Sequence, residues 1–104
     1  MRDFDDLKAH LDESGRLTSW PSPRKGKGLQ ELALEYLARC FEIGRHYSER
    51  EVNDLLNSHH TFGDPALLRR ELYERGYLRR LKDGTRYWRE AEDDGTGGGS
   101  RSFG

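Results

Sequence analysis

Two segments in the middle of the chain carry the polar and apolar pattern of short amphipathic helices. In the first of them, Val52, Leu55 and Leu56 recur at helical spacing. Ser48 precedes this apolar set, and Glu51 follows Ser48 three residues later, which is the spacing of a capping box. The pattern predicts a helix that begins directly after Ser48.

The second segment predicts a helix over residues 65–75. Asp64 is suited to the N-cap, and the proline after it is suited to the first helical position, where a missing N–H costs nothing. Leu68 and Leu72 share one face, and Gly76 can supply the left-handed residue that ends a helix. The two segments together predict a helix, a tight turn and a second helix.

The residues after this pair predict a β-hairpin. Residues 77–82 and 85–89 are rich in β-prone side chains, and Asp83 and Gly84 lie between them. An Asp-Gly pair in this position is typical of a two-residue type I′ turn, in which both residues have positive φ. Two helices followed by a hairpin are the arrangement of a winged helix-turn-helix, so the fold class expected is α+β with a three-helix core and a C-terminal wing.

The remaining core helix is expected over residues 29–41 and is expected to end at Gly44. A further link, residues 45–47, is expected to pair with the hairpin strands, as it often does in winged helices. The apolar stripe of this helix has helical spacing and consists of Leu29, Leu32, Ala33, Tyr36, Leu37 and Cys40.

The two ends of the chain are set apart from this core. Residues 1–15 predict a short amphipathic helical segment, which could pack on the domain or on a partner. Residues 16–90 form the predicted domain, and an extended arm at its start would place Leu17 and Trp20 against the core. Residues 91–104 are acidic and then glycine-rich, a composition typical of disorder.

Charge is distributed unevenly over these parts. The chain of 104 residues has a formal net charge of −1, but residues 16–89 hold 15 lysines and arginines against 10 acids. A basic module suits a partner of negative charge, although such an excess also occurs on an ordinary solvated surface. The single cysteine rules out an intrachain disulfide, and no apolar run is long enough to span a bilayer. We therefore expect a cytoplasmic protein.

If the module binds double-stranded DNA, helix 65–75 is the element expected to enter the major groove, with hairpin 77–89 on the flanking backbone. The expected contacts lie on the helix, the hairpin, the turn and the arm: Arg69, Arg70, Tyr73, Lys82, Arg86, His60, Arg24, Lys25 and Lys27. The alternative for the helix is structural. Arg70 could pair with Glu74, and Arg69 could pair with Glu42 or another acid to brace the fold.

An enzyme is the class that the sequence favours least. His46, His59, His60 and Cys40 lack a recognised metal-ligand spacing, and no glycine-rich loop follows a predicted strand. Cys40 lies on an apolar face without a partner that would activate it. We expect no catalytic site, no metal and no cofactor.

Four stretches of the chain, RLTSWPSPRK, EIGRHYSEREVNDLL, HTFGDPALLRREL and DGTRYWR, resemble the prokaryotic family called domain of unknown function 2087. The resemblance covers about residues 16–89. Members occur alone or behind helix-turn-helix regulator domains of the arsenic-repressor type, and they are often labelled transcriptional regulators. The resemblance implies a winged-helix-like, transcription-related protein without catalytic residues. The positions that carry it are Trp20, Pro21, Phe62, Asp64, Arg69, Arg70, Glu71, Leu72, Tyr87 and Trp88.

Two functions are therefore expected to compete. The first is DNA binding, which requires a continuous basic surface that joins the arm, the helix and the hairpin. The second is docking on a regulator protein or on a second copy of the chain, in which acids would neutralise the arginines beside an exposed apolar patch.

Overall fold

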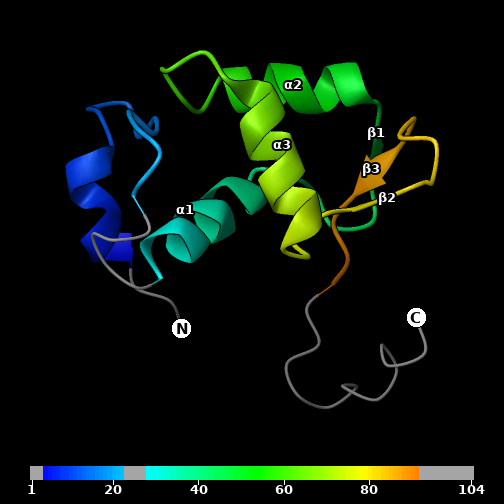
Figure 1. Cartoon of the computed structure of the whole chain (residues 1–104), viewed down its shortest axis with the longest axis horizontal. Helices are drawn as coiled ribbons and strands as arrows, with labels where there is room; N and C mark the ends of the chain where they lie inside the picture. Colours follow the sequence, from blue (N-terminus) through cyan, green and yellow to red (C-terminus); the bar gives the residue numbers. More distant parts are fainter. Residues whose placement is uncertain (1–3, 23–27, 92–104) are drawn as a thin grey trace.

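A computed structural model describes residues 4–22 and 28–91 of the chain (Figure 1). These residues form three α-helices, one 3₁₀ helix and one small antiparallel sheet. The strand order is β1-β3-β2, so β3 lies in the middle. The elements, in chain order, are the 3₁₀ helix η1 (Phe4–His10), α1 (Leu29–Ala38), β1 (His46–Tyr47), α2 (Glu49–Asn57), α3 (Pro65–Glu74), β2 (Arg79–Arg80) and β3 (Tyr87–Trp88). The fold is mixed α+β.

The start signals of α2 and α3 act as the sequence predicts. Ser48 Oγ accepts a hydrogen bond from the Glu51 N–H at 3.1 Å, and Glu51 Oε1 accepts one from the Ser48 N–H at 2.9 Å. This reciprocal pair is a complete capping box. At α3, Asp64 Oδ1 accepts from the Leu67 N–H at 3.1 Å, and Pro65 occupies the first turn.

The C-terminal end of α3 is closed by a Schellman motif. Gly76 has a φ of +88°. The Gly76 N–H donates to the Tyr73 carbonyl at 3.1 Å, and the Tyr77 N–H donates to the Leu72 carbonyl at 2.8 Å. These two bonds turn the chain directly from α3 toward β2, so the predicted end at Gly76 is confirmed.

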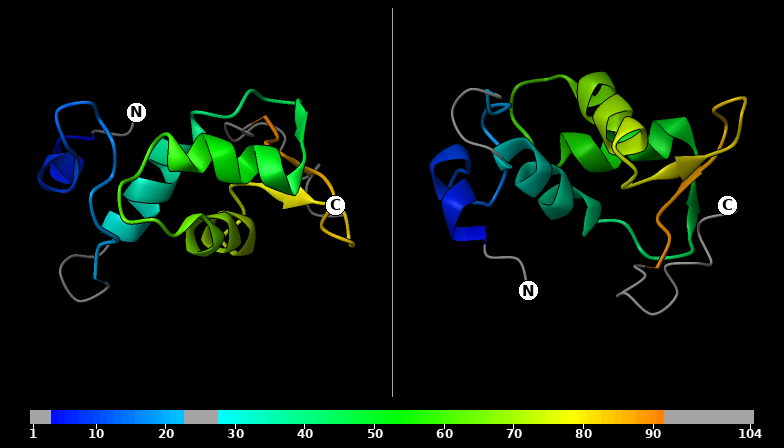
Figure 2. Two further views of the ribbon diagram at one scale, coloured as in Figure 1. Left: turned by 90° about the horizontal axis from the view of Figure 1, so that it is seen from above. Right: turned by 60° about the horizontal axis from the view of Figure 1, so that its bottom comes forward.

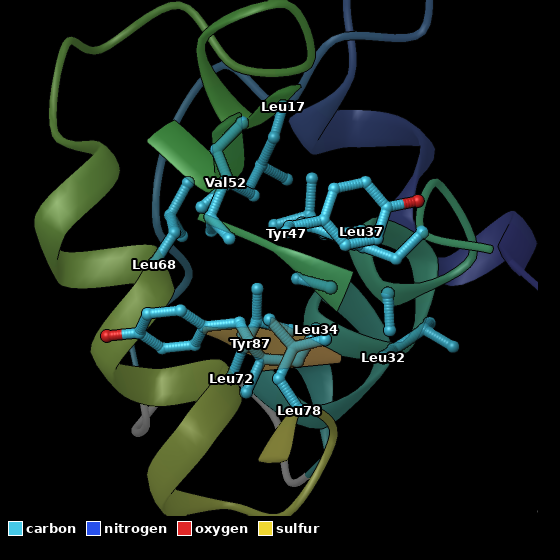
Figure 3. Close-up of a cluster of buried hydrophobic side chains, with 14 of the residues drawn as sticks. Leu17, Leu32, Leu34, Leu37, Tyr47, Val52, Leu68, Leu72, Leu78 and Tyr87 are labelled. Carbon is cyan, nitrogen blue, oxygen red and sulfur yellow. The ribbon is translucent and has the colours of Figure 1, made fainter. Parts of the chain in front are cut away.

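The core gathers around α1, and Figure 3 shows many of its side chains. The predicted stripe of α1 is incomplete, because Leu34 is also fully buried and α1 is therefore covered on several sides. The helix is also shorter than expected. It ends at Ala38, and Phe41 and Gly44 lie in the turns that follow, where Gly44 has a φ of +84°.

The N-terminal segment packs on the domain rather than away from it. Leu7 of η1 is fully buried, and the Phe4 ring meets the Tyr36 ring edge-on at 5.3 Å. The arm then crosses the link between α2 and α3. The Leu17 N–H donates to the His59 carbonyl at 2.8 Å, and the Leu17 carbonyl accepts from the Thr61 N–H at 2.9 Å. These contacts confirm that the arm places Leu17 against the core.

The link between α2 and α3 spans residues 58–64 and is longer than the tight turn that the sequence suggests. Its length follows from its contacts, since it pairs with the arm through a bridge between Leu17 and His60. Figure 2 shows this green connection beside the blue arm.

The sheet confirms the expected pairing of residues 45–47 and corrects the hairpin. His46 pairs with Trp88 and Arg79 pairs with Trp88 on its other side, but each strand has only two residues. The turn is not type I′, because among the described residues no non-glycine residue has a positive φ and only Gly84 of the Asp83-Gly84 pair does, at +75°. The strands are joined instead by a wider loop, residues 81–86.

That loop is held by its own hydrogen bonds. The Leu81 N–H donates to the Arg86 carbonyl at 3.0 Å, and the Gly84 N–H donates to the Leu81 carbonyl at 2.9 Å. Asp83 Oδ1 accepts from both the Thr85 N–H at 3.0 Å and the Thr85 hydroxyl at 2.7 Å. A side chain that bonds two residues ahead in this way stabilises a turn without positive φ at Asp83.

Candidate nucleic-acid interface

The exposed face of α3 is opposite the face that packs in the core. Leu68 and Leu72 are fully buried, which leaves Arg70, Tyr73 and Glu74 in solvent. Figure 1 shows α3 lying across the middle of the molecule, with the loop after β2 to one side of it.

Arg69 belongs to the fold rather than to the exposed face. Its guanidinium donates a hydrogen bond to Asn53 Oδ1 and lies 3.4 Å from Glu49 Oε2, both on α2. Only 18% of its side chain is exposed. The structural alternative therefore describes this residue, with Glu49 as the acid rather than Glu42.

Arg70 behaves differently from its neighbour. It is exposed, and within residues 4–22 and 28–91 it forms no ion pair or hydrogen bond through its side chain. The expected pair with Glu74 is not formed. Arg70 therefore presents an uncompensated positive charge at the middle of the exposed face of α3.

Tyr73 is connected to the sheet by a residue that the predicted contact set left out. The guanidinium of Arg80, on β2, lies 4.4 Å from the centre of the Tyr73 ring. Polar interaction with the Tyr73 side chain, and more weakly with Tyr87, raises the pKa of Arg80 above its ordinary value. The sequence does not predict this contact, because the contact depends on the pairing of Arg80 with Tyr87 across a strand of only two residues.

The loop 81–86 contributes two exposed cations, Lys82 and Arg86. Neither forms an ion pair with another residue in the part of the chain that the structure describes. The carboxylate of Asp83 is engaged by Thr85, and this hydrogen bonding lowers its pKa. The described residues of the loop and of the exposed α3 face thus carry three cations without an ion pair, Arg70, Lys82 and Arg86, against two acids without one, Glu74 and Asp83.

His60 is not available to a phosphate, which corrects its place among the predicted contacts. The residue is 4% exposed, and its Nε2 accepts a hydrogen bond from the Asp64 N–H at 2.9 Å. Because Nε2 is the acceptor, Nδ1 carries the proton and donates to the Leu56 carbonyl at 2.6 Å. Both ring nitrogens are therefore used to join the end of α2 to the start of α3.

The cations predicted on the arm, Arg24, Lys25 and Lys27, lie outside the described residues. A basic surface that joins them to α3 therefore stays a prediction.

Arg75 is the remaining arginine of the α3 end, and acids neutralise it. It lies 2.8 Å from carboxylate oxygens of both Glu31 and Glu71, and its guanidinium is 5.9 Å from the Trp20 ring. The hydrogen bond to Glu31 is the main cause of its raised pKa. This network fastens α3 to α1 and to the arm.

Three other observations concern metal binding, thiol reactivity and membrane crossing. The described residues contain no group of three or more histidines, cysteines and acids placed to hold a metal ion. Cys40 is half-buried, and burial raises the pKa of its thiol, which keeps it protonated. None of the helices in the same residues is both long and apolar enough to cross a membrane.

Comparison with known families gives one match. A family described as an uncharacterized protein conserved in bacteria, domain of unknown function 2087, matches residues 16–89. The chain belongs to this family. No curated protein and no solved structure matches it. Within domain of unknown function 2087, the matched residues include the arm, all three helices and the sheet of this member, while η1 precedes them.

Proposed function

We propose that this member of domain of unknown function 2087 is a winged-helix module that binds double-stranded DNA in a transcription-related role. In this proposal α3 enters the major groove, and the loop 81–86 contacts the neighbouring phosphate backbone.

The observation that carries the proposal is the free Arg70 on the exposed face of α3, which adjoins a cationic loop. The contact between Tyr73 and Arg80 ties this helix face to the loop that holds Lys82 and Arg86. Arginine and lysine side chains without acid partners are the groups that neutralise phosphates and release counterions. Arg70 can also reach a guanine edge with two donors.

The arrangement of the elements supports the same proposal. A helix, a short strand, two helices and a hairpin follow one another, and β1 completes the sheet beside β3. This is the order that a winged helix requires. The free acids on the surface, above all Glu74, limit the positive charge, so we expect modest affinity that depends strongly on salt.

The proposal is tested by fluorescence anisotropy with a generic labelled duplex over a salt series. The unmodified protein should bind with an affinity that falls linearly in log[salt], and Arg70→Gln should make the slope shallower by about 0.9, the value for one lost phosphate contact. Arg39→Gln is the control, because Arg39 is also exposed but lies over Phe4 of η1. Absence of binding at low salt by the folded protein would refute the proposal.

A second candidate function, docking on a regulator protein, is favoured by the outer face of the sheet. His46 stacks on Trp88 with ring centres 4.8 Å apart and planes 10° apart, and Ile43 nearby is 53% exposed. Exposed aromatic and apolar groups are typical of docking surfaces. Trp88→Ala should abolish such docking without changing the salt slope of DNA binding.

A further inference from the structure

Arg80 is held in a fixed position at the junction of α3, β2 and the loop 81–86. Its register partner on β3, Tyr87, is buried, whereas the preceding strand residue, Arg79, is on the outer side of the sheet and lies 3.6 Å from Glu90. The Tyr73 ring covers one face of the Arg80 guanidinium at 4.4 Å. Neighbouring arginines on one strand therefore have opposite surroundings.

Gly84 completes the enclosure on the loop side. A Cβ atom at this position would lie 3.1 Å from an outer nitrogen of Arg80, and the residue has a φ of +75°. The loop therefore comes close to the guanidinium, and it is the positive φ that favours glycine at this position. Gly84 is itself buried, so the Arg80 guanidinium has the Tyr73 ring on one side and the loop backbone on another.

Unlike Arg69 and Arg75, Arg80 forms no ion pair among the described residues, although the charge of the exposed Asp83 carboxylate on the adjoining loop interacts with it. Arg69 and Arg75 each lie within 3.4 Å of a carboxylate oxygen, but no ion pair is formed by Arg80. Its Nε is buried without a hydrogen-bond partner. A guanidinium that is already oriented and that no salt bridge engages can stabilise an anion that approaches from solvent, because part of the cost of ordering the side chain has already been met.

We propose that Arg80, Tyr73 and Arg70 form a phosphate-binding site at the junction of α3 and the loop. Arg80 provides the fixed guanidinium. The Tyr73 side chain is 40% exposed, so its hydroxyl can donate to a phosphate oxygen. Arg70 lies one helical turn before Tyr73 on the same face, which places its exposed guanidinium within reach of the same anion.

The phosphate has two possible sources. The first is a phosphodiester of the duplex, in which case this site rests on the proposed function and supplies the backbone contact that positions α3. The second is free phosphate or a phosphorylated small molecule. Both sources share the tetrahedral, anionic oxygen cluster that arginine and tyrosine donors recognise.

The test compares Arg80→Gln with Arg79→Gln, which change the charge equally at adjacent positions on opposite faces of β2. Anisotropy with the labelled duplex should show about tenfold weaker binding and a salt slope shallower by about 0.9 for Arg80→Gln. Arg79→Gln should match the unmodified protein. Tyr73→Phe retains the ring over Arg80 but loses the hydroxyl and its polar interaction with Arg80, and it should weaken binding about threefold.

A second measurement distinguishes the two sources. Inorganic phosphate is added to the unmodified protein, with chloride at equal ionic strength as the control, while the amide signals of Gly84 and Tyr73 are followed by NMR. If the protein binds no DNA but phosphate shifts these signals saturably, the DNA proposal falls and the site remains as one for free phosphate. If DNA binds and Arg80→Gln behaves like Arg79→Gln, the site falls and the proposed function remains.

Two further outcomes complete the test. Should Arg80→Gln fail to fold, by circular dichroism, Tyr73→Phe decides: an affinity and phosphate response equal to those of the unmodified protein overturn the site. Should the folded protein respond neither to DNA nor to phosphate, both proposals are overturned.

Discussion

Replacing His60 should destabilise the fold strongly while leaving DNA binding by the folded protein unchanged. His60→Phe keeps a buried ring but removes the acceptor for the Asp64 N–H, which starts α3. The Leu56 carbonyl loses the hydrogen bond from His60 Nδ1 but still accepts one from the His59 N–H at 2.9 Å. The Asp64 N–H is therefore the group that the variant leaves without a partner. This hydrogen bond is partly buried, and a buried donor left without its partner costs about 1–3 kcal/mol.

His60→Ala should cost more than His60→Phe. The alanine variant also loses a ring that is 4% exposed and that meets the Phe62 ring edge-on at 4.7 Å. The cavity and the lost contact should add about 1–2 kcal/mol. A domain of this size is stable by about 5–10 kcal/mol, so His60→Ala should remove a large part of the total.

Urea unfolding followed by tryptophan fluorescence measures both variants, with His59→Ala as the control. His59 Nδ1 forms a hydrogen bond with the Leu55 carbonyl at 2.9 Å, and this carbonyl also accepts one from the Ser58 N–H. His59→Ala therefore leaves no backbone group without a partner, and it should lower the free energy of unfolding by less than about 1 kcal/mol. A free energy of unfolding for His60→Phe within about 0.5 kcal/mol of the unmodified value would refute the assigned role of the imidazole.

Three further predictions follow from burial and charge. Leu34→Ala should lower the free energy of unfolding by about 2–5 kcal/mol in the same urea assay, because Leu34 is fully buried; a loss below about 1 kcal/mol would contradict its place in the core. The thiol of Cys40 has a raised pKa, so a thiol reagent at neutral pH should react much more slowly with folded than with urea-unfolded protein. Asp12, engaged mainly by the Arg16 backbone, and Asp83, engaged by Thr85, have lowered pKa values, so their stabilisation is present above the unfolded Asp range of about 3.9 and is lost as pH falls through the lower folded values. Asp12→Asn should therefore make the acid limb of a stability-against-pH curve shallower, and an unchanged limb would contradict this.

The features that the sequence predicted well are local ones. Ser48 and Glu51 form the capping box, and Asp64 caps α3, because each device needs only residues within one turn of the helix. Gly76 ends α3 for the same reason. The sequence predicts these caps because the donors and acceptors that form their hydrogen bonds are close to one another in the chain.

The features that the sequence did not predict depend on contacts between segments that are distant in the chain. Nothing near Arg69 and Arg70 in the chain tells which of them meets α2, since Glu49 and Asn53 lie far from both in sequence. The sequence places His60 in a turn and so predicts that it is exposed. In the structure the arm pairs with this link through the bridge between Leu17 and His60, and His60 is buried.

The hairpin shows a different limit. The Asp-Gly pair favours a type I′ turn, but the approach of Gly84 to Arg80 and the hydrogen bonds of Asp83 to Thr85 stabilise a wider loop. Tertiary packing there overrides a local preference.

Arg69 braces the fold against α2, whereas Arg70 is proposed to contact DNA. The most direct test is the salt dependence of duplex binding for Arg69→Gln and Arg70→Gln, measured side by side on proteins shown to be folded. The account predicts a slope shallower by about 0.9 for Arg70→Gln alone, while Arg69→Gln keeps the slope and loses thermal stability. Equal slopes in both variants and in the unmodified protein, or a reduced slope for Arg69→Gln alone, would contradict it.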